Sequence, residues 1–209
     1  MITFNIIKQN LKEVPMKYLR TLIILTTALL LLSACNNGDS TEQGETKQVD
    51  EFTAVTQDGE EFNTSDLEGH WWVADFIFTN CETVCIPMTA NMLKLQEMLE
   101  EEGLDDVKLV SFSVDPERDT PEVLQEYAEE NGVDLDRWTF LTGYDFEEIE
   151  QYAIDTFKVW VAAPEEGSDQ VEHASYFSLV SPEGRIENHY SGTKAEQMEN
   201  IIEDLKRLQ

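Results

Sequence analysis

The sequence predicts an α/β fold in which a central mixed sheet lies between layers of helices. Apolar runs typical of strands alternate with helical patterns along most of the chain, as in proteins built on a largely parallel sheet. Two turn signals, Asp58-Gly59 and Ser181-Pro182-Glu183-Gly184, each separate a pair of short strand patterns and so indicate an N-terminal and a C-terminal hairpin. The 209 residues, 41% of them hydrophobic, suit one such domain with appendages.

The first part of the domain is predicted to contain a hairpin, a buried strand and a helix. The hairpin joins Phe52–Val55 to a strand around Phe62. Trp71–Phe78 is almost continuously apolar, as expected of a strand buried on both faces. After it, four apolar residues recur at helical spacing: Met88, Met92, Leu95 and Leu99. The two methionines could supply thioether ligands for copper, but their spacing favours core packing.

A second strand–helix unit follows. Val107–Val114 reads as another buried strand, and Thr120-Pro121 combines an N-cap with a proline at the first helical position. The helix that starts there is predicted to end near Gly132, and Trp138–Leu141 forms a third strand. Because a helical crossover joins Trp71–Phe78 to Val107–Val114, these two strands are expected to be parallel.

The last part is predicted to contain two helices and the second hairpin. Asp145 and Glu148 resemble a capping box for a helix that runs through Phe157. Tyr176–Val180 and Arg185–Tyr190 form the hairpin, and the closing helix is Lys194–Leu208. Together these elements predict a thioredoxin-like three-layer sandwich over residues 49–209.

The composition is strongly acidic. The formal net charge is −29 and the isoelectric point is near 4.1, so the Lys/Arg footprint that DNA or RNA requires is absent. Anionic lipid head groups would also repel the folded part, so membrane residence needs an apolar anchor. Without residues 1–35, which hold four basic residues and one acid, the charge is −32. Most of these acids are interpreted as a solvated shell.

Residues 1–35 are interpreted as a lipoprotein signal peptide. Lys17 and Arg20 precede an apolar run at 22–32, which is too short to span a bilayer. Leu32-Ser33-Ala34-Cys35 resembles a bacterial lipoprotein box, which implies that Cys35 is acylated and becomes the mature N-terminus. Residues 1–15 are interpreted as an upstream mis-start. The alternative is an uncleaved anchor with Cys35 unmodified. Either way, we expect the protein to face outward. In the lipoprotein interpretation it is extracytoplasmic and held at the cell membrane by its lipid, to which a flexible linker at 36–48 joins the folded domain.

The candidate chemistry lies at Cys81 and Cys85. Both thiols follow a buried strand and stand at the start of the helix predicted near Val84. A helix N-terminus stabilises thiolates, and a four-residue separation lets both sulfurs approach one point. This pattern is compatible with a redox disulfide or a shared soft metal ion, and also with two buried structural thiols.

Other residues are weaker candidates. His173 is predicted at the start of strand Tyr176–Val180, and each of His70, His173 and His189 is by itself more typical of a surface or core group than of a ligand. Asp115 follows strand Val107–Val114, so topology predicts that it lies near Cys81 at the same sheet edge, as a candidate second-shell group. Capping the turn before Pro116 is an equally good interpretation.

Four segments resemble the SCO/SenC family of copper-handling assembly factors for cytochrome c oxidase. They are Phe78–Cys85, Ser113–Pro121, Phe140–Gly143 and His173 with Tyr176–Ile186. The resemblance implies a thioredoxin-like fold and one copper ion, Cu(I) or Cu(II), bound by Cys81, Cys85 and His173. It implies as partners the copper-bearing subunit of the oxidase and other copper chaperones or thiol–disulfide reductases. Glu82 and Ile86 replace the proline that family members often have after each cysteine, which affects the expected loop rigidity and redox potential.

Three functions are compatible with these residues. The first is copper delivery to the binuclear copper centre of the oxidase, or reduction of that centre's cysteines. The second is a thiol–disulfide oxidoreductase without a physiological metal. The spacing of the two cysteines and the histidine before Tyr176, where ordinary thioredoxin-like reductases have C-x2-C and a proline, favour the metal. The third is a peroxidase, which Phe78 disfavours because such enzymes usually have threonine at that position.

Overall fold

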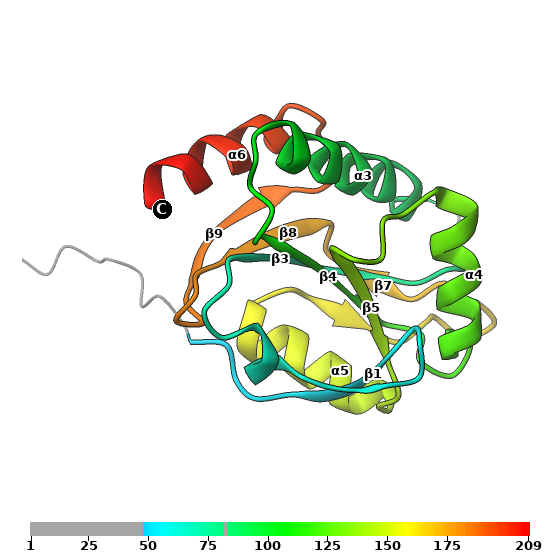
Figure 1. Ribbon diagram of the computed structural model, residues 1–209. Helices are drawn as coiled ribbons and strands as arrows, with labels where there is room; N and C mark the ends of the chain where they lie inside the picture. Colours follow the sequence, from blue (N-terminus) through cyan, green and yellow to red (C-terminus); the bar gives the residue numbers. More distant parts are fainter. Residues whose placement is uncertain (1–47, 82) are drawn as a thin grey trace, which may run out of the picture. The chain divides into compact units, whose positions relative to one another are not determined.

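A seven-stranded mixed sheet forms the centre of the computed structural model, which describes residues 48–81 and 83–209 (Figure 1). Its strands are β1 Thr53–Thr56, β2 Glu61–Asn63, β3 Trp72–Ile77, β4 Lys108–Ser113, β5 Trp138–Thr142, β8 Tyr176–Val180 and β9 Ile186–Ser191. They lie in the order β2-β1-β5-β4-β3-β8-β9. β3, β4 and β5 are parallel neighbours, and the remaining pairs are antiparallel. Both predicted hairpins and the parallel central strands are confirmed.

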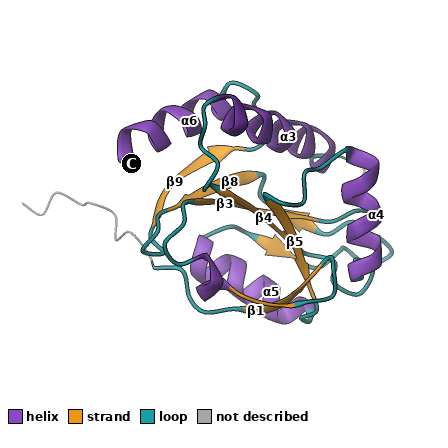
Figure 2. Cartoon of the chain, viewed as in Figure 1, coloured by secondary structure: helices purple, strands orange, loops and turns teal. Residues whose placement is uncertain are grey.

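Helices cover both faces of this sheet. They are α3 Cys85–Glu101, α4 Pro121–Asn131, α5 Phe146–Tyr152 and α6 Gln197–Leu208. α3 and α6 lie together on one side of the sheet, and α5 lies on the other (Figures 1 and 2). A hydrogen bond between the hydroxyls of Thr89 and Tyr127 joins α4 to α3. The thioredoxin-like sandwich predicted from the sequence is therefore the observed fold.

The core contains the residues whose periodicity indicated burial. Every residue of β3 is buried, and Met88 and Met92 are 0% exposed, so the two methionines serve core packing as predicted. Burying a side chain of this size contributes about 1.5–3 kcal/mol relative to leaving it in water. On the α5 side of the sheet, aromatic rings stack edge-on and face-on against one another: Phe52, Phe76, Phe112, Tyr152 and Phe157.

The structure contains short elements that the periodicity did not reveal. A 3-10 turn, η2 Thr64–Leu67, follows the first hairpin. The helix predicted to run through Phe157 does so, but its last part, η3 Ala153–Phe157, is a π-helix. β6 Val161–Ala162 and β7 Glu172–His173 form a separate two-stranded sheet. The prediction that His173 begins strand 176–180 was therefore wrong, because His173 pairs with Val161 before the chain enters β8.

The N-terminal predictions lie mostly outside the described residues. These are the signal peptide 1–35 with Cys35, and linker residues 36–47. Gln48, the last residue of the predicted linker, forms an isolated bridge with Arg185, and the amide of Val49 donates to the carbonyl oxygen of Gly184 at 2.7 Å. Within residues 48–81 and 83–209, no helix has the length and apolar character needed to cross a bilayer.

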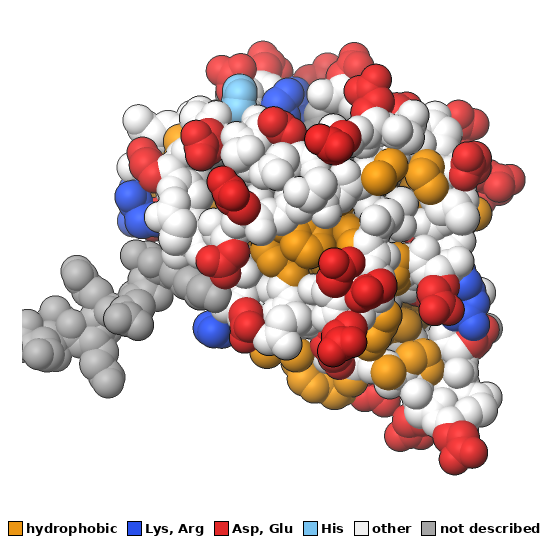
Figure 3. Space-filling view, turned by 90° about the horizontal axis from the view of Figure 1, so that it is seen from below, with side chains coloured by type: hydrophobic (Ala, Val, Ile, Leu, Met, Phe, Trp, Pro, Cys, Tyr) orange, Lys and Arg blue, Asp and Glu red, His pale blue; other side chains and the backbone are white. Residues whose placement is uncertain are grey.

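Acidic side chains dominate the surface charge. On the face shown in Figure 3 they are spread widely, basic side chains are few, and apolar groups show between them. This distribution fits the interpretation of the acids as a solvated shell, which keeps a protein soluble through self-repulsion between copies.

Candidate metal centre

The two cysteines lie between β3 and α3. Cys81 is in the connection, and Cys85 is the first residue of α3. The N-cap residue Val84 makes no side-chain capping bond, so the backbone N–H groups of the first helical turn are available to other acceptors. Pro87 falls in that same turn, where a proline removes no helical hydrogen bond. Ile86, the residue after Cys85, is 67% exposed.

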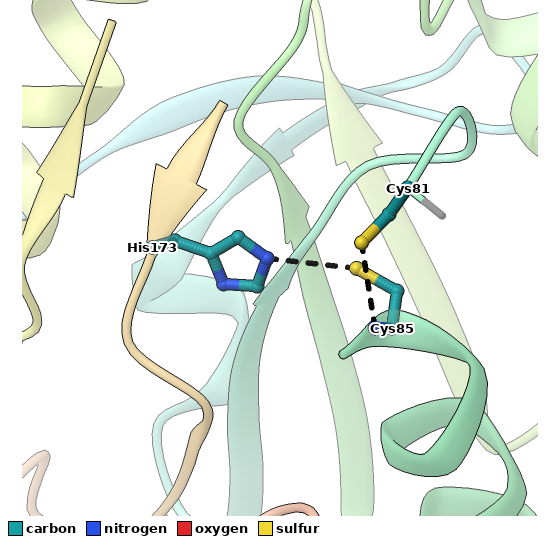
Figure 4. A group of neighbouring side chains, drawn as sticks. All are labelled: Cys81, Cys85 and His173. Atoms are coloured by element: carbon teal, nitrogen blue, oxygen red, sulfur yellow. Dashed lines mark hydrogen bonds between the residues drawn. The ribbon is translucent and has the colours of Figure 1, made fainter. Parts of the chain in front are cut away.

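The structure brings Cys81, Cys85 and His173 together (Figure 4). Their two sulfurs and one ring nitrogen all lie within 4.8 Å of one another. His173 Nε2 is 3.5 Å from Cys85 Sγ, and the backbone N–H of Cys85 donates to Cys81 Sγ at 3.4 Å. The sulfur of Cys81 thus accepts a hydrogen bond from the helix N-terminus, as the position of the pair predicted.

The ring of His173 is oriented by two neighbours. Its Nδ1 lies 3.3 Å from the carbonyl oxygen of Ala174. Because a carbonyl oxygen only accepts, this contact places a proton on Nδ1 and leaves Nε2 as the ring nitrogen that faces Cys85. The ring of Phe78 packs edge-on against the imidazole, with ring centroids 5.8 Å apart. These two contacts fix the ring so that Nε2 is the nitrogen presented to the two sulfurs.

The two thiols have opposite pKa shifts. The hydrogen bond with the Cys85 thiol is the largest influence that lowers the pKa of Cys81, to about 3, and His173 and backbone N–H groups add to it against partial burial. The pKa of Cys85 is raised, first because its proton is held by the Cys81 sulfur and second because Cys85 is buried. Cys81 is consequently the thiolate and the accessible sulfur, and Cys85 is the protonated partner.

Hydrogen bonds also tie the segment carrying Cys81 to the segment carrying His173. The side-chain amide of Asn80 donates to Asp169 at 2.9 Å, and the side-chain amide of Gln170 donates to the carbonyl oxygen of Asn80 at 3.0 Å. These contacts hold two stretches together that are about 90 residues apart in sequence. The sequence patterns did not identify this connection.

A buried carboxyl group, Asp75, lies on β3, the strand that leads into the Cys81 loop, and the sequence patterns did not single it out. It is 0% exposed, and its Oδ1 accepts a hydrogen bond from Ser111 Oγ at 2.5 Å. Among the described residues its other oxygen, Oδ2, has no hydrogen-bond partner. Burial raises the pKa of Asp75 to about 7, against smaller opposing effects of Ser111 and His173. The only signal in the sequence was a single acid inside an otherwise apolar strand.

The other candidate residues are placed elsewhere. The carboxylate of Asp115 pairs with Arg118 at 2.7 Å, and its backbone carbonyl accepts the N–H groups of Arg118 and Asp119. This is the turn-forming role, and a second-shell role for Asp115 stays a prediction. His189 Nδ1 lies 2.9 Å from Ser178 Oγ. Within the described part of the chain, the one group of His, Cys, Asp or Glu that could hold a metal ion is Cys81, Cys85 and His173.

Surface hollows flank Cys81 on both sides. One, of 360 Å³, lies between the Cys81 loop and the segment from Trp160 to His173. The other, of 230 Å³, extends over the first turns of α3 toward Tyr127. A macromolecular partner or a small thiol therefore has access to the Cys81 sulfur from the protein surface.

The model of the SCO1/SenC family matches residues 40–209. The SCO1 protein homolog of Bacillus subtilis (strain 168) is 44% identical over 183 residues, which are 87% of this chain and 94% of that protein.

Three solved structures are similar to the described fold. A SCO1/SenC family lipoprotein from Bacillus anthracis str. Ames is 46% identical with a TM-score of 0.74, over 78% of this chain and 96% of that one. BsSco, a member of the Sco family of cytochrome c oxidase assembly proteins in which a disulfide switch was identified, is 44% identical with a TM-score of 0.70, over 78% and 94%. ScoI of Arabidopsis thaliana with copper bound is 26% identical with a TM-score of 0.65, over 76% and 98%.

Proposed function

Because the chain belongs to the SCO1/SenC family, we propose that it binds one copper ion through Cys81, Cys85 and His173 and assists assembly of the binuclear copper centre of cytochrome c oxidase. The observation that carries this proposal is the convergence of two sulfurs and one imidazole nitrogen within 4.8 Å. The copper-bound plant relative and the description of BsSco as an oxidase assembly protein support the choice of metal and of task.

The donor set fits copper. Thiolate sulfur is a soft ligand that suits Cu(I), and imidazole extends the set toward Cu(II). Of the two sulfurs, Cys81 is already held as a thiolate, so binding both to one ion requires the loss of the Cys85 proton. Bound copper would be cargo for the oxidase subunit rather than a resident cofactor.

The same thiol pair supports a second way to assist assembly, in which this chain reduces the cysteines of the oxidase. The thiolate of Cys81 would attack a disulfide of the partner, and Cys85 would then displace the partner's second sulfur. This exchange leaves the partner with two thiols and this chain with a Cys81–Cys85 disulfide. The alternative function, a thiol–disulfide oxidoreductase without a physiological metal, would use the same steps. The orientation of the His173 ring toward Cys85 favours the metal, since that exchange does not require it.

We expect anaerobic Cu(I) titration of the reduced full-length protein in detergent to saturate at one equivalent. His173→Ala should lower the affinity measured against a competing chelator by about tenfold or more, because one of three ligands is lost. Cys81→Ser and Cys85→Ser should lower it further. His189→Ala is the matched control and should bind like the wild type. Equal affinity of the His173→Ala and wild-type proteins would remove His173 from the proposed ligand set.

We further propose that Cys35 is lipidated and anchors the protein on the outer side of the cell membrane. The lipoprotein box and the similarity to a lipoprotein of Bacillus anthracis support this. Two acyl chains bind a bilayer stably, since each buried methylene contributes about 0.8 kcal/mol. Cys35→Ser should therefore shift the protein from the membrane to the soluble fraction after cell lysis. Cys81→Ser, a matched control, should stay with the membrane, and retention of Cys35→Ser there would refute the lipid anchor.

A further inference from the structure

A second buried carboxyl group, Asp119, lies in the loop between β4 and α4 and reaches across to the Cys81 loop. It is 0% exposed. Its oxygens accept three hydrogen bonds: from the hydroxyl of Thr79 at 2.6 Å, from the backbone N–H of Thr79 at 3.2 Å, and from the hydroxyl of Ser113 at 2.6 Å. Burying a carboxylate is costly unless donors replace its water, and three donors do so here.

Two of those three bonds hold a single residue of the Cys81 loop. Thr79 occupies the second position of a turn that the backbone N–H of Cys81 closes by donating to the carbonyl oxygen of Phe78 at 3.4 Å. The backbone N–H and the hydroxyl of Thr79 are both bound to the same carboxylate, so neither group can turn away without losing a bond. The other end of the turn carries the sulfur of Cys81.

The turn also joins the third member of the site. Phe78, its first residue, packs edge-on against the His173 ring, and Asn80, its third residue, is bonded to Asp169. A shift of the turn would therefore move Cys81 relative to both Cys85 and His173. Cys85 belongs to α3, and Asp119 has no hydrogen bond to it among the described residues.

We propose that Asp119 is a positioning residue that acts through Thr79 to hold the Cys81 sulfur close to the Cys85 sulfur and in place to bind the copper ion. Only the copper part of this inference rests on the proposed function. The effect of Asp119 on the disulfide does not depend on copper binding. Holding one sulfur near the other raises its effective concentration, which favours the disulfide and a two-sulfur metal site alike. Loosening the turn should weaken both.

The first test measures the equilibrium between the protein dithiol with oxidised glutathione and the protein disulfide with two reduced glutathiones. It uses the full-length chain with Cys35→Ser, so that Cys81 and Cys85 are the only thiols. Asp119→Asn and Thr79→Val should each lower the equilibrium constant at least fivefold, and the double variant should lie within twofold of the larger single effect. Thr79→Ser keeps the hydroxyl and should stay within twofold of the starting protein.

A destabilised control separates positioning from general stability. Thr120→Ala removes the N-cap of α4 next to Asp119 but leaves the hydrogen bonds between Asp119 and Thr79 in place. It should therefore lower the melting temperature but change the glutathione equilibrium constant by less than twofold. If Asp119→Asn and Thr79→Val lower the melting temperature but leave the constant within twofold, their role is structural and the proposal is wrong.

The second test repeats the comparison with Cu(I). Asp119→Asn should lower the affinity at least fivefold when Cys81 is present and less than twofold in a Cys81→Ser background, because Asp119 acts through that sulfur. Equal losses in both backgrounds would overturn the copper part of the proposal. Should the wild-type protein bind no copper at all, the proposed function fails, and the glutathione constants still decide whether Asp119 positions Cys81.

Discussion

Iodoacetamide should alkylate Cys81 and leave Cys85 unmodified in the reduced protein, and the rate should change little between pH 8 and pH 5. Alkylation requires the thiolate, and a thiol of ordinary pKa loses about three orders of magnitude of thiolate over that range. Cys81 is expected to stay a thiolate over that range, because the thiol of Cys85 and the backbone N–H groups that face the Cys81 sulfur lower the pKa of Cys81 to about 3. Peptide mass spectrometry of the Cys35→Ser protein at timed intervals measures both the site and the rate.

The control for this experiment is Cys81→Ser, which leaves Cys85 as the only target near the site. Cys85 is 3% exposed, so its alkylation should be slow at every pH tested. One equivalent of Cu(I) should protect Cys81 in the parent protein. A Cys81 rate that falls tenfold for each pH unit below 8 would show that the sulfur is not held as a thiolate, and would contradict the assignment of Cys81 as the attacking group.

Much of the site could be predicted because its two sulfurs belong to one local pattern. A buried strand, a short connection and a helix start fix where Cys81 and Cys85 lie relative to each other, and this is local geometry that periodicity reveals. The family resemblance added His173, which spacing alone left equal to His70 and His189. The fold followed from the alternation of strands and helices, since a helical crossover makes Trp71–Phe78 and Val107–Val114 parallel.

The remaining features depend on tertiary contacts that no sequence period encodes. β6 and β7 have two residues each, which is too short for an alternating pattern. His173 was therefore predicted at the start of the next strand, which is β8, although it lies in β7. The acceptor for His173 Nδ1 is a backbone carbonyl, which every residue possesses, so the sequence does not mark it. Asp75 and Asp119 read as ordinary acids among 43 until the fold shows that both are buried.

The second large effect concerns Asp75 and the dependence of stability on pH. Burial raises the pKa of Asp75 from 3.8 to about 7, so the folded protein binds this proton more tightly than the unfolded chain does. The resulting stabilisation is complete below pH 4 and is lost as the pH rises through 7. At 1.36 kcal/mol per pKa unit, the loss is about 4 kcal/mol at most.

Asp75→Asn should remove this dependence, because asparagine keeps the acceptor for Ser111 and resembles the protonated acid in shape. Its free energy of unfolding, measured by urea titration, should match the wild-type value near pH 4 and exceed it by about 2–4 kcal/mol at pH 8. The exposed Asp106 provides the control, since Asp106→Asn should change the difference between pH 4 and pH 8 by less than about 0.5 kcal/mol. Equal pH dependence of Asp75→Asn and wild type would mean that Asp75 is ionised in the fold throughout this range, with water reaching its Oδ2. The negative charge of Asp75 would then help to raise the pKa of Cys85 over the whole range, whereas a protonated Asp75 contributes no charge there.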